Sequence, residues 1–120
     1  MGILPYYRGM DCHLWALINS DFDNIGLSTH LMDEGIDTGN LLKIMRIKVE
    51  QAEKFNDLED LIEYFMPQFI VETIIDIQNN SYIELKQDHS DGKQYFSIKN
   101  VKLLSQAKDN FEIYKKTKKP

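Results

Sequence analysis

The chain contains 120 residues, with 14 basic and 19 acidic side chains and a formal net charge of −5. Hydrophobic residues make up 42% of the sequence and charged residues 28%, a balance typical of a soluble globular domain and not of a disordered chain. A single chain of this size buries roughly 65% of its unfolded surface. The sequence therefore predicts one compact unit with a core.

Two features narrow the location and the chemistry. No apolar run approaches the ~18 residues that a membrane span needs, and we expect no signal peptide. Cys12 is the single cysteine, so it cannot form an internal disulfide and has no partner at metal-ligand spacing. We expect a cytoplasmic protein without a membrane partner and without a metal.

Charge is distributed unevenly along the chain. Residues 1–98 carry 7 basic and 17 acidic side chains, whereas residues 99–120 carry 7 lysines, Asp109 and Glu112. The acidic body would repel a nucleic-acid backbone, and only the tail, most lysine-rich over about 115–120, could attract one. Nucleic acid is therefore not an expected partner.

The first elements follow from local patterns. Residues 1–9 are expected to be extended chain that runs into a loop, and Asp11 to cap a short helix over about 12–19. Alternating apolar and polar residues over 25–32 predict a strand. The two glycines and three acidic residues within 33–40 predict a loop.

The second half contains the longest predicted element. After a strand at about 41–49, a helical pattern extends to about residue 79, with Asn56 or Asp57 as its cap and Pro67 as a kink or a break. Beyond it we expect a strand at 82–86, a turn-rich stretch at 88–92 and a closing lysine-rich helix. The inner stripe of that last helix is predicted to be Val101, Leu104, Ala107, Phe111 and Tyr114. Strands and helices together indicate the α/β class.

His30 and Asp37 are the first candidates for chemistry. A histidine on a strand and a carboxylate in the following loop can converge on one pocket, since open α/β sheets bind ligands at the loops after their strands. The carboxylate could accept a proton, orient water or hold an imidazolium. Purely structural roles, a hydrogen-bonded strand histidine and a turn aspartate, stay open for both residues.

Two loops could contact a ligand. Gly35 and Gly39 allow the backbone to approach a ligand closely, and exposed peptide groups there could pair with the edge of a flat heterocycle; a plain loop is the alternative. The segment at residues 4–9 could present aromatic faces and the Arg8 guanidinium to an anionic or ring-shaped ligand. Alternatively, its tyrosines are half-buried and Arg8 forms a local ion pair. Among the remaining rings, Trp15 is expected in the core, and His13 and His89 at the surface.

Taken in order, four segments resemble one protein family. They are ILPYYRG at 3–9, WALI at 15–18, GLSTH at 26–30 and DEGIDTG at 33–39. Together they resemble the folate-dependent formyltransferases, which include methionyl-tRNA formyltransferase, glycinamide ribonucleotide transformylase and the sugar-nucleotide N-formyltransferases. The resemblance is strongest over residues 2–49, where Ser28 replaces the family's usual threonine.

The resemblance implies a fold and an activity. Residues 1–120 would form one partial domain, the C-terminal half of a Rossmann-like α/β formyltransferase domain, with a mixed sheet and a long helix. The implied activity is transfer of a formyl group from 10-formyltetrahydrofolate to an amine. A small amine or a sugar-nucleotide amine is favoured over methionyl-tRNA as acceptor because the body of the chain is acidic.

The resemblance also assigns residues. Asp37 matches the family's catalytic aspartate and His30 its strand histidine, so both are predicted to be catalytic. The predicted folate contacts are Leu4, Pro5, Glu34, Gly35, Ile36 and Asp37. The predicted acceptor contacts are Tyr7 and Arg8.

One departure from the family pattern is as informative as the match. The family's Asn and His, which stabilise the oxyanion formed when the amine attacks the formyl carbon, align upstream of Met1 and outside these 120 residues. We therefore expect no formyl transfer by these residues alone. The partner would be a missing N-terminal half or a second copy of the chain.

Two other functions remain open at this level. The chain could be a non-catalytic remnant that self-associates into a dimer or larger assembly, since strands at 25–32 and 41–49 would expose edges and apolar faces. Less favoured is a dimeric aspartic protease that uses Asp37-Thr38-Gly39. Proteases of that type are nearly all-β, whereas residues 57–79 have a helical pattern.

Overall fold

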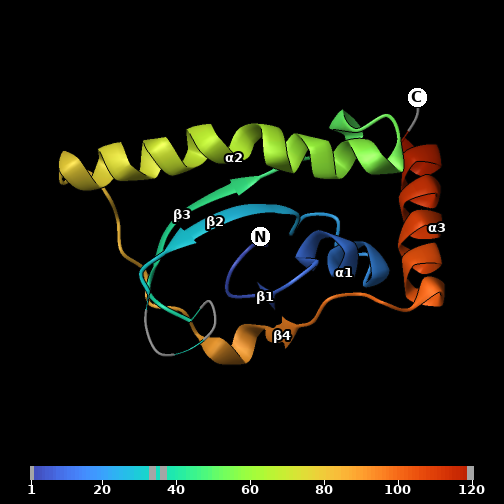
Figure 1. The fold of residues 1–120 in the computed structure, drawn as a ribbon, viewed down its shortest axis with the longest axis horizontal. Helices are drawn as coiled ribbons and strands as arrows, with labels where there is room; N and C mark the ends of the chain where they lie inside the picture. Colours follow the sequence, from blue (N-terminus) through green and yellow to red (C-terminus); the bar gives the residue numbers. More distant parts are fainter. Residues whose placement is uncertain (1, 33–34, 36–37, 119–120) are drawn as a thin grey trace.

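The computed structural model of the chain describes residues 2–32, 35 and 38–118. Its elements follow in the order β1 (Tyr7–Gly9), α1 (Cys12–Ile18), β2 (Gly26–His30), β3 (Leu41–Arg46), η1 (Val49–Gln51), α2 (Phe55–Gln78), η2 (His89–Asp91), β4 (Lys93–Tyr95) and α3 (Val101–Lys118) (Figure 1). Strands and helices are thus both present, as predicted for the α/β class.

The strands pair in two small sheets. β2 and β3 are antiparallel, with Leu27 opposite Met45, whereas β1 and β4 are parallel, with Arg8 opposite Gln94. Parallel and antiparallel pairing both occur, as expected of a mixed sheet, but within the described residues they are divided between separate sheets.

The helices enclose the β2–β3 sheet on one side and one end. α2 runs along one face of the sheet, and α3 stands across the N-terminal end of α2, while α1 lies beside α3 at the end of β1 (Figure 1). Side chains from all these layers meet in one core that excludes water. Its fully buried members include Leu17, Ile25, Ile47, Leu58, Ile62 and Phe111.

The start of α1 differs from its prediction in one respect. Asp11 precedes the helix as expected, but it adopts a left-handed conformation (φ 54°) and makes no side-chain cap. Its carboxylate instead accepts hydrogen bonds from the backbone N–H of Ile98 (2.9 Å) and the hydroxyl of Ser97 (3.4 Å). Asp11 therefore joins the start of α1 to the segment that leads into α3.

His13 was predicted at the surface, and this prediction is wrong. Only 7% of the residue is exposed, because α1 packs beneath α2 and α3 and places His13 beside Leu58 and Leu104. Burial lowers the pKa of His13 below its ordinary value of 6.5, and the nearby carboxylate of Asp11 opposes this shift only in part. The folded protein therefore favours the neutral ring.

The burial of His13 predicts that the folded protein becomes less stable at acidic pH. Below pH ~6.5 the unfolded chain takes up a proton at His13 that the folded chain does not, so the unfolding free energy should fall as pH decreases, by at most about 1.4 kcal/mol per pH unit. Urea unfolding between pH 7.5 and 5.5 measures the slope. In His13→Gln this contribution disappears, while the carboxylates titrate in both proteins. Identical slopes for the two proteins would contradict the assignment.

α2 starts earlier than predicted and is not divided. It begins at Phe55, where the backbone N–H of Lys54 donates to the carboxylate of Asp57 at 2.9 Å. Pro67 lies inside one continuous helix. Proline removes only one backbone donor, and the turns after it are held by packing of Phe69 and Thr73 against the sheet.

Three further predictions need correction. The strand expected at 82–86 is reduced to a single bridge between Leu85 and Leu41, whereas β4 was not predicted. In α3, Ala107 and Phe111 are buried as expected, but Val101 is 80% exposed because it lies in the first turn, at the edge of the packed region.

Trp15 was expected in the core but is only half-buried. Its indole N–H donates to the carbonyl of Phe96 at 2.8 Å.

Two features are absent from the described residues. None of the helices there has a stretch that is long and apolar enough to cross a bilayer. No group of three or more His, Cys, Asp or Glu side chains within those residues could hold a metal ion.

Candidate functional site

Ser28 connects the first segment of the chain to β2. Its hydroxyl donates to the carbonyl of Gly2 at 2.7 Å and accepts a hydrogen bond from the backbone N–H of Leu4 at 3.0 Å. Leu4 is almost fully buried as a result of this contact with the strand. The segment that holds Leu4 and Pro5 therefore lies beside the strand that ends at His30.

His30 occupies the last position of β2, where the loop over 31–40 begins. Its Nδ1 lies 2.8 Å from the carbonyl oxygen of Leu31. Because a carbonyl can only accept a hydrogen bond, Nδ1 carries the proton in this contact, and in the neutral ring Nε2 then holds the lone pair. The contact gives this half-buried ring a defined orientation and one basic nitrogen.

The base of the loop is held by hydrogen bonds from both sides. The backbone N–H of Leu31 donates to the carbonyl of Asn40 at 2.9 Å, which closes the loop on itself. The side-chain amide of Gln87, a buried residue, donates to the carbonyl of Gly39. The side-chain amide of Asn40 donates to the carboxylate of Glu84 at 2.7 Å. The segment at 84–87 thus fixes the point where the loop returns to β3.

Removal of the Gln87 amide should loosen this loop. Gln87→Ala leaves the Gly39 carbonyl without its buried donor, a change that typically costs about 1–3 kcal/mol. Hydrogen exchange at residues 38–41, together with urea unfolding, measures the effect. The matched control is Gln68→Ala, because Gln68 is exposed and its side-chain amide donates to Glu72 within α2. Equal effects from both variants would contradict the role given to Gln87.

The predicted loop residues fall largely outside the described part of the chain. Glu34, Ile36 and Asp37 lie outside the described residues, so their assigned roles stay predictions. Gly35 is described: a Cβ atom placed on it would lie 2.1 Å from the hydroxyl oxygen of Thr38. Position 35 therefore has little room for a side chain beside Thr38.

Arg8 and Pro5 are brought together. The guanidinium of Arg8 donates through Nη1 to the carbonyl of Pro5 at 3.2 Å, so its side chain turns back over its own segment. The carbonyl of Pro5 and the backbone of Tyr6 also pack against Gly92, where a Cβ atom would lie only 2.3–2.4 Å away. These contacts fix the shape of the segment. The acceptor-binding role of Arg8 and the folate-binding role of Pro5 stay predictions.

Tyr7 is more deeply buried than Arg8, the other residue predicted to contact the acceptor. Its ring is buried and stacks on Tyr95 at a centroid distance of 5.1 Å. Its hydroxyl donates to the carboxylate of Asp21 at 2.9 Å, and burial is the main cause that raises the pKa of this phenol well above its ordinary value. In this position Tyr7 links β1 to the core, and its predicted contact with an acceptor stays untested.

Two residues that position the site, Gln87 and Ser28, were not predicted from the sequence. Gln87 stands between a lysine and an aspartate in no recognisable pattern, and its bond to Gly39 crosses 48 positions. Ser28 offered one signal, because it occupies the family's threonine position, which preserves a hydroxyl group. Its link to Gly2 and Leu4 could not be read from spacing alone.

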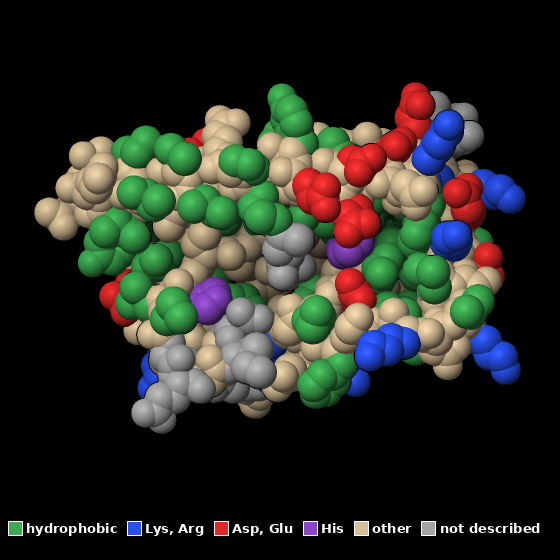
Figure 2. Space-filling view, viewed as in Figure 1, with side chains coloured by type: hydrophobic (Ala, Val, Ile, Leu, Met, Phe, Trp, Pro, Cys, Tyr) green, Lys and Arg blue, Asp and Glu red, His purple; other side chains and the backbone are tan. Residues whose placement is uncertain are grey.

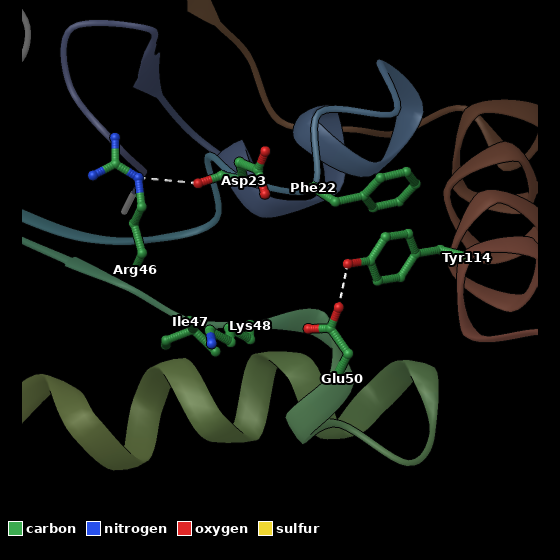
Figure 3. A pocket seen from close by; sticks show the side chains of 7 residues that line it. All are labelled: Phe22, Asp23, Arg46, Ile47, Lys48, Glu50 and Tyr114. Carbon is green, nitrogen blue, oxygen red and sulfur yellow. Dashed lines mark hydrogen bonds between the residues drawn. The ribbon is translucent and has the colours of Figure 1, made fainter. Parts of the chain in front are cut away.

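A separate cleft of about 620 Å³ lies between η1, the end of β3 and α3. The ring of Phe22 stacks on Tyr114 at 4.1 Å, and the Tyr114 hydroxyl donates to Glu50, while Arg46 donates to the carbonyl of Asp23 at 3.1 Å (Figure 3). The bond to Glu50 is the main cause that raises the pKa of Tyr114 to about 12. The lining of this cleft contains none of the site residues predicted from the sequence.

Comparison with known proteins gives the family. A family model described as formyl transferase matches residues 2–74. The methionyl-tRNA formyltransferase of Lachnospira eligens is 32% identical over 89 residues, which cover 74% of this chain and 28% of that protein. The chain thus spans less than a third of the length of this relative.

Solved structures show the same fold at lower identity. A 4-N formyltransferase from Francisella tularensis aligns with 92% of this chain and 49% of its own, with a TM-score of 0.67 and 23% identity. WlaRD, a sugar 3N-formyl transferase solved in the presence of dTDP and 5-N-formyl-THF, aligns with 99% of this chain and 47% of its own, with a TM-score of 0.69 and 22% identity. The residues that tie the N-terminal segment to β2 and hold the loop after His30 lie within or beside the matched region, and the chain belongs to the formyl transferase family.

Proposed function

We propose that the chain contributes one wall of a site that transfers a formyl group from 10-formyltetrahydrofolate to an amine. The observation that carries the proposal is the junction at β2, where Ser28 holds the Leu4–Pro5 segment two residues before His30. The family match over residues 2–74 supports the same reading. When bound, the folate would supply an activated formyl group.

The residues present are compatible with such a ligand. A pterin ring needs peptide groups along its edge and apolar contacts on its faces. Beside the loop, Leu31 and Met32 expose apolar side chains. The predicted folate contacts are the backbone of residues 34–37 together with Leu4 and Pro5.

His30 and Asp37 are the residues proposed to handle protons. The bond to the Leu31 carbonyl keeps the proton of a neutral His30 ring on Nδ1, so that Nε2 could accept one from the attacking amine. Asp37 is proposed to orient that proton acceptor or a water molecule, by resemblance to the family's aspartate. The Asn and His that would stabilise the oxyanion are proposed to come from outside residues 1–120.

The acceptor is proposed to be a sugar-nucleotide amine or another small amine, and not methionyl-tRNA. The acidic body of residues 1–98 supports this choice because it would repel RNA. The relative named above is a methionyl-tRNA formyltransferase, so the two acceptor classes must be compared directly.

Calorimetric titration tests the proposal with the chain as it exists. We expect 5-formyltetrahydrofolate, a stable analogue of the donor, to bind, and His30→Ala to weaken that binding. Lys48→Ala is the matched control, because Lys48 lines the separate cleft and should leave the affinity unchanged. A dTDP-amino sugar should bind more tightly than methionyl-tRNA. Absence of folate binding would overturn the proposal and favour the non-catalytic alternative.

Turnover is a separate test. With 10-formyltetrahydrofolate and an amino sugar, the 120-residue chain is expected to form no formylated product above background, because the oxyanion donors lie outside it. Removal of a single such donor already costs about 10²–10³ in rate. Robust turnover would show that other groups of this chain stabilise the oxyanion.

A further inference from the structure

Thr73 is a polar residue on the inner, otherwise apolar side of α2. It follows Leu58, Ile62 and Phe69 along that side, and only 6% of it is exposed. A buried hydroxyl group is costly unless it is hydrogen-bonded, whereas a valine of nearly the same size carries no such cost. Packing alone therefore does not explain a threonine at this position.

Two hydrogen bonds occupy the hydroxyl group of Thr73. It donates to the backbone carbonyl of Phe69 at 3.0 Å, and its oxygen lies 3.0 Å from the hydroxyl oxygen of Thr29 on β2. Because the single hydroxyl proton of Thr73 is used in the bond to Phe69, its oxygen accepts a hydrogen bond from Thr29. The Thr29 side chain is thus held in one orientation by α2.

The residue opposite Thr29 is bonded to the same turn of α2. Lys43 on β3 pairs with Thr29, and its ammonium lies 3.3 Å from the carboxylates of Glu72 and Asp76. These two are the charged residues between positions 64 and 78, a part of α2 along which Figure 2 shows mainly hydrophobic side chains. One turn of the helix therefore holds both members of the Thr29–Lys43 pair.

The regular register of the sheet ends directly after this pair. Thr29 lies opposite Lys43 in the regular ladder. The next residue of β2, His30, lies opposite Leu41, which leaves Leu42 as an extra residue on β3. Such a bulge bends and twists the sheet locally and changes the direction of the side chains beside it, and bulges are frequent next to functional sites for this reason. The direction of the His30 ring therefore depends on how Thr29 is held.

We propose that Thr73 is a positioning residue for His30: its bond to Thr29 fixes β2 at the bulge and so sets the direction of the His30 ring. Successive side chains of a strand point to opposite faces, so Thr73 acts on His30 through the backbone of β2 and not by contact. The direction that it sets brings Nδ1 of His30 to 2.8 Å from the carbonyl oxygen of Leu31. The contribution of Thr73 to ligand binding rests on the proposed formyl transfer, whereas its effect on the ring does not.

Nitrogen NMR of the histidine rings tests the effect on the ring, with the full chain and no ligand. In the wild type the neutral His30 ring should carry its proton on Nδ1. Thr73→Val should move part of the protons to Nε2, because the bond to the Leu31 carbonyl weakens, and Thr73→Ser should restore the wild-type signals because it keeps the hydroxyl group. The ring signals of His13, which lies beside the first turns of α2, should stay the same in both variants.

Two further variants make this test specific. Thr29→Val removes the other hydroxyl group of the pair, so it should change the His30 signals as Thr73→Val does, and the double variant should add nothing further. Thr117→Val is the matched control, because the exposed hydroxyl group of Thr117 also donates to a carbonyl one turn earlier in its own helix, at 2.8 Å. Unchanged His30 signals in Thr73→Val, or equal changes at His13, would overturn the proposal.

Calorimetric titration with 5-formyltetrahydrofolate tests the consequence for binding. Thr73→Val should weaken the affinity about three- to tenfold, the usual net value of one hydrogen bond, and Thr73→Ser should restore it. If the wild type binds no folate, the proposed function fails, while the NMR result still decides the role of Thr73. If the wild type and Thr73→Val bind folate equally well, Thr73 does not position His30 for the ligand, and this part of the inference is wrong.

Discussion

Gly39→Ala is expected to destabilise the loop after β2 and to weaken folate binding at least tenfold. A Cβ atom on Gly39 would lie 1.6 Å from the carbonyl oxygen of Leu31, which is backbone and cannot rotate away. A forced backbone shift of this kind costs about 1–3 kcal/mol. Because the same carbonyl holds Nδ1 of His30, the shift should also disturb the ring.

The control for this prediction lies in the same loop. A Cβ atom on Gly35 would meet only the side chain of Thr38, which can rotate, so Gly35→Ala should cost less unfolding free energy than Gly39→Ala. Urea unfolding and calorimetric titration with 5-formyltetrahydrofolate measure the two effects for each variant. Equal stability of the two variants would show that the contact between Gly39 and Leu31 does not constrain the loop.

Phe111→Ala is expected to lower the unfolding free energy by about 3–5 kcal/mol, the usual cost of deleting a fully buried aromatic side chain. Phe111 is completely buried and contacts the ring of Phe55 edge-on, so it connects α3 to the start of α2. The expected loss is a large fraction of the about 5–15 kcal/mol that stabilises a typical domain.

Urea unfolding monitored by circular dichroism measures this loss. Ile113→Ala is the matched control two positions along α3, because Ile113 is mostly exposed and its truncation should change stability by less than about 0.5 kcal/mol. If Phe111→Ala behaved like the control, the packing of α3 described above would be wrong.

The helices and the β2–β3 pair were predictable because their signals are local. Alternation over 25–32 and 41–49 located β2 and β3, and apolar spacing located α2 and α3 to within a few residues. β1 and β4 were not predictable in the same way. Each has only three residues, and each exists because it pairs with the other across 86 positions, as in the Tyr7–Lys93 pair.

Burial was less predictable than secondary structure. His13 looked like a surface residue because a short helix alone does not reveal what packs over it, and α2 and α3 arrive from more than 40 positions away. Val101 fits the spacing of the apolar residues of α3, but the first turn of the helix lies outside the core and leaves Val101 exposed. In both cases tertiary contacts decided the outcome.

The candidate site could be predicted only through its motifs. The resemblance selected His30 and the segment at residues 4–9 as site residues, and these roles stay predictions. The family match confirms the family that the resemblance indicated. The side chains that hold these pieces together, Ser28 and Gln87, act through hydrogen bonds to residues far away in sequence. Such bonds leave no periodic pattern in a single sequence.

Titration of the ¹⁵N-labelled chain with 5-formyltetrahydrofolate, followed by amide chemical shifts, tests the central claim most directly. If the chain forms a wall of the formyl-transfer site, the shifts should concentrate at Leu4, Tyr6, His30, Leu31 and Gly39. Amides around the separate cleft at Phe22, Lys48 and Tyr114 should not move. An unchanged spectrum, or shifts confined to that cleft, would contradict the account.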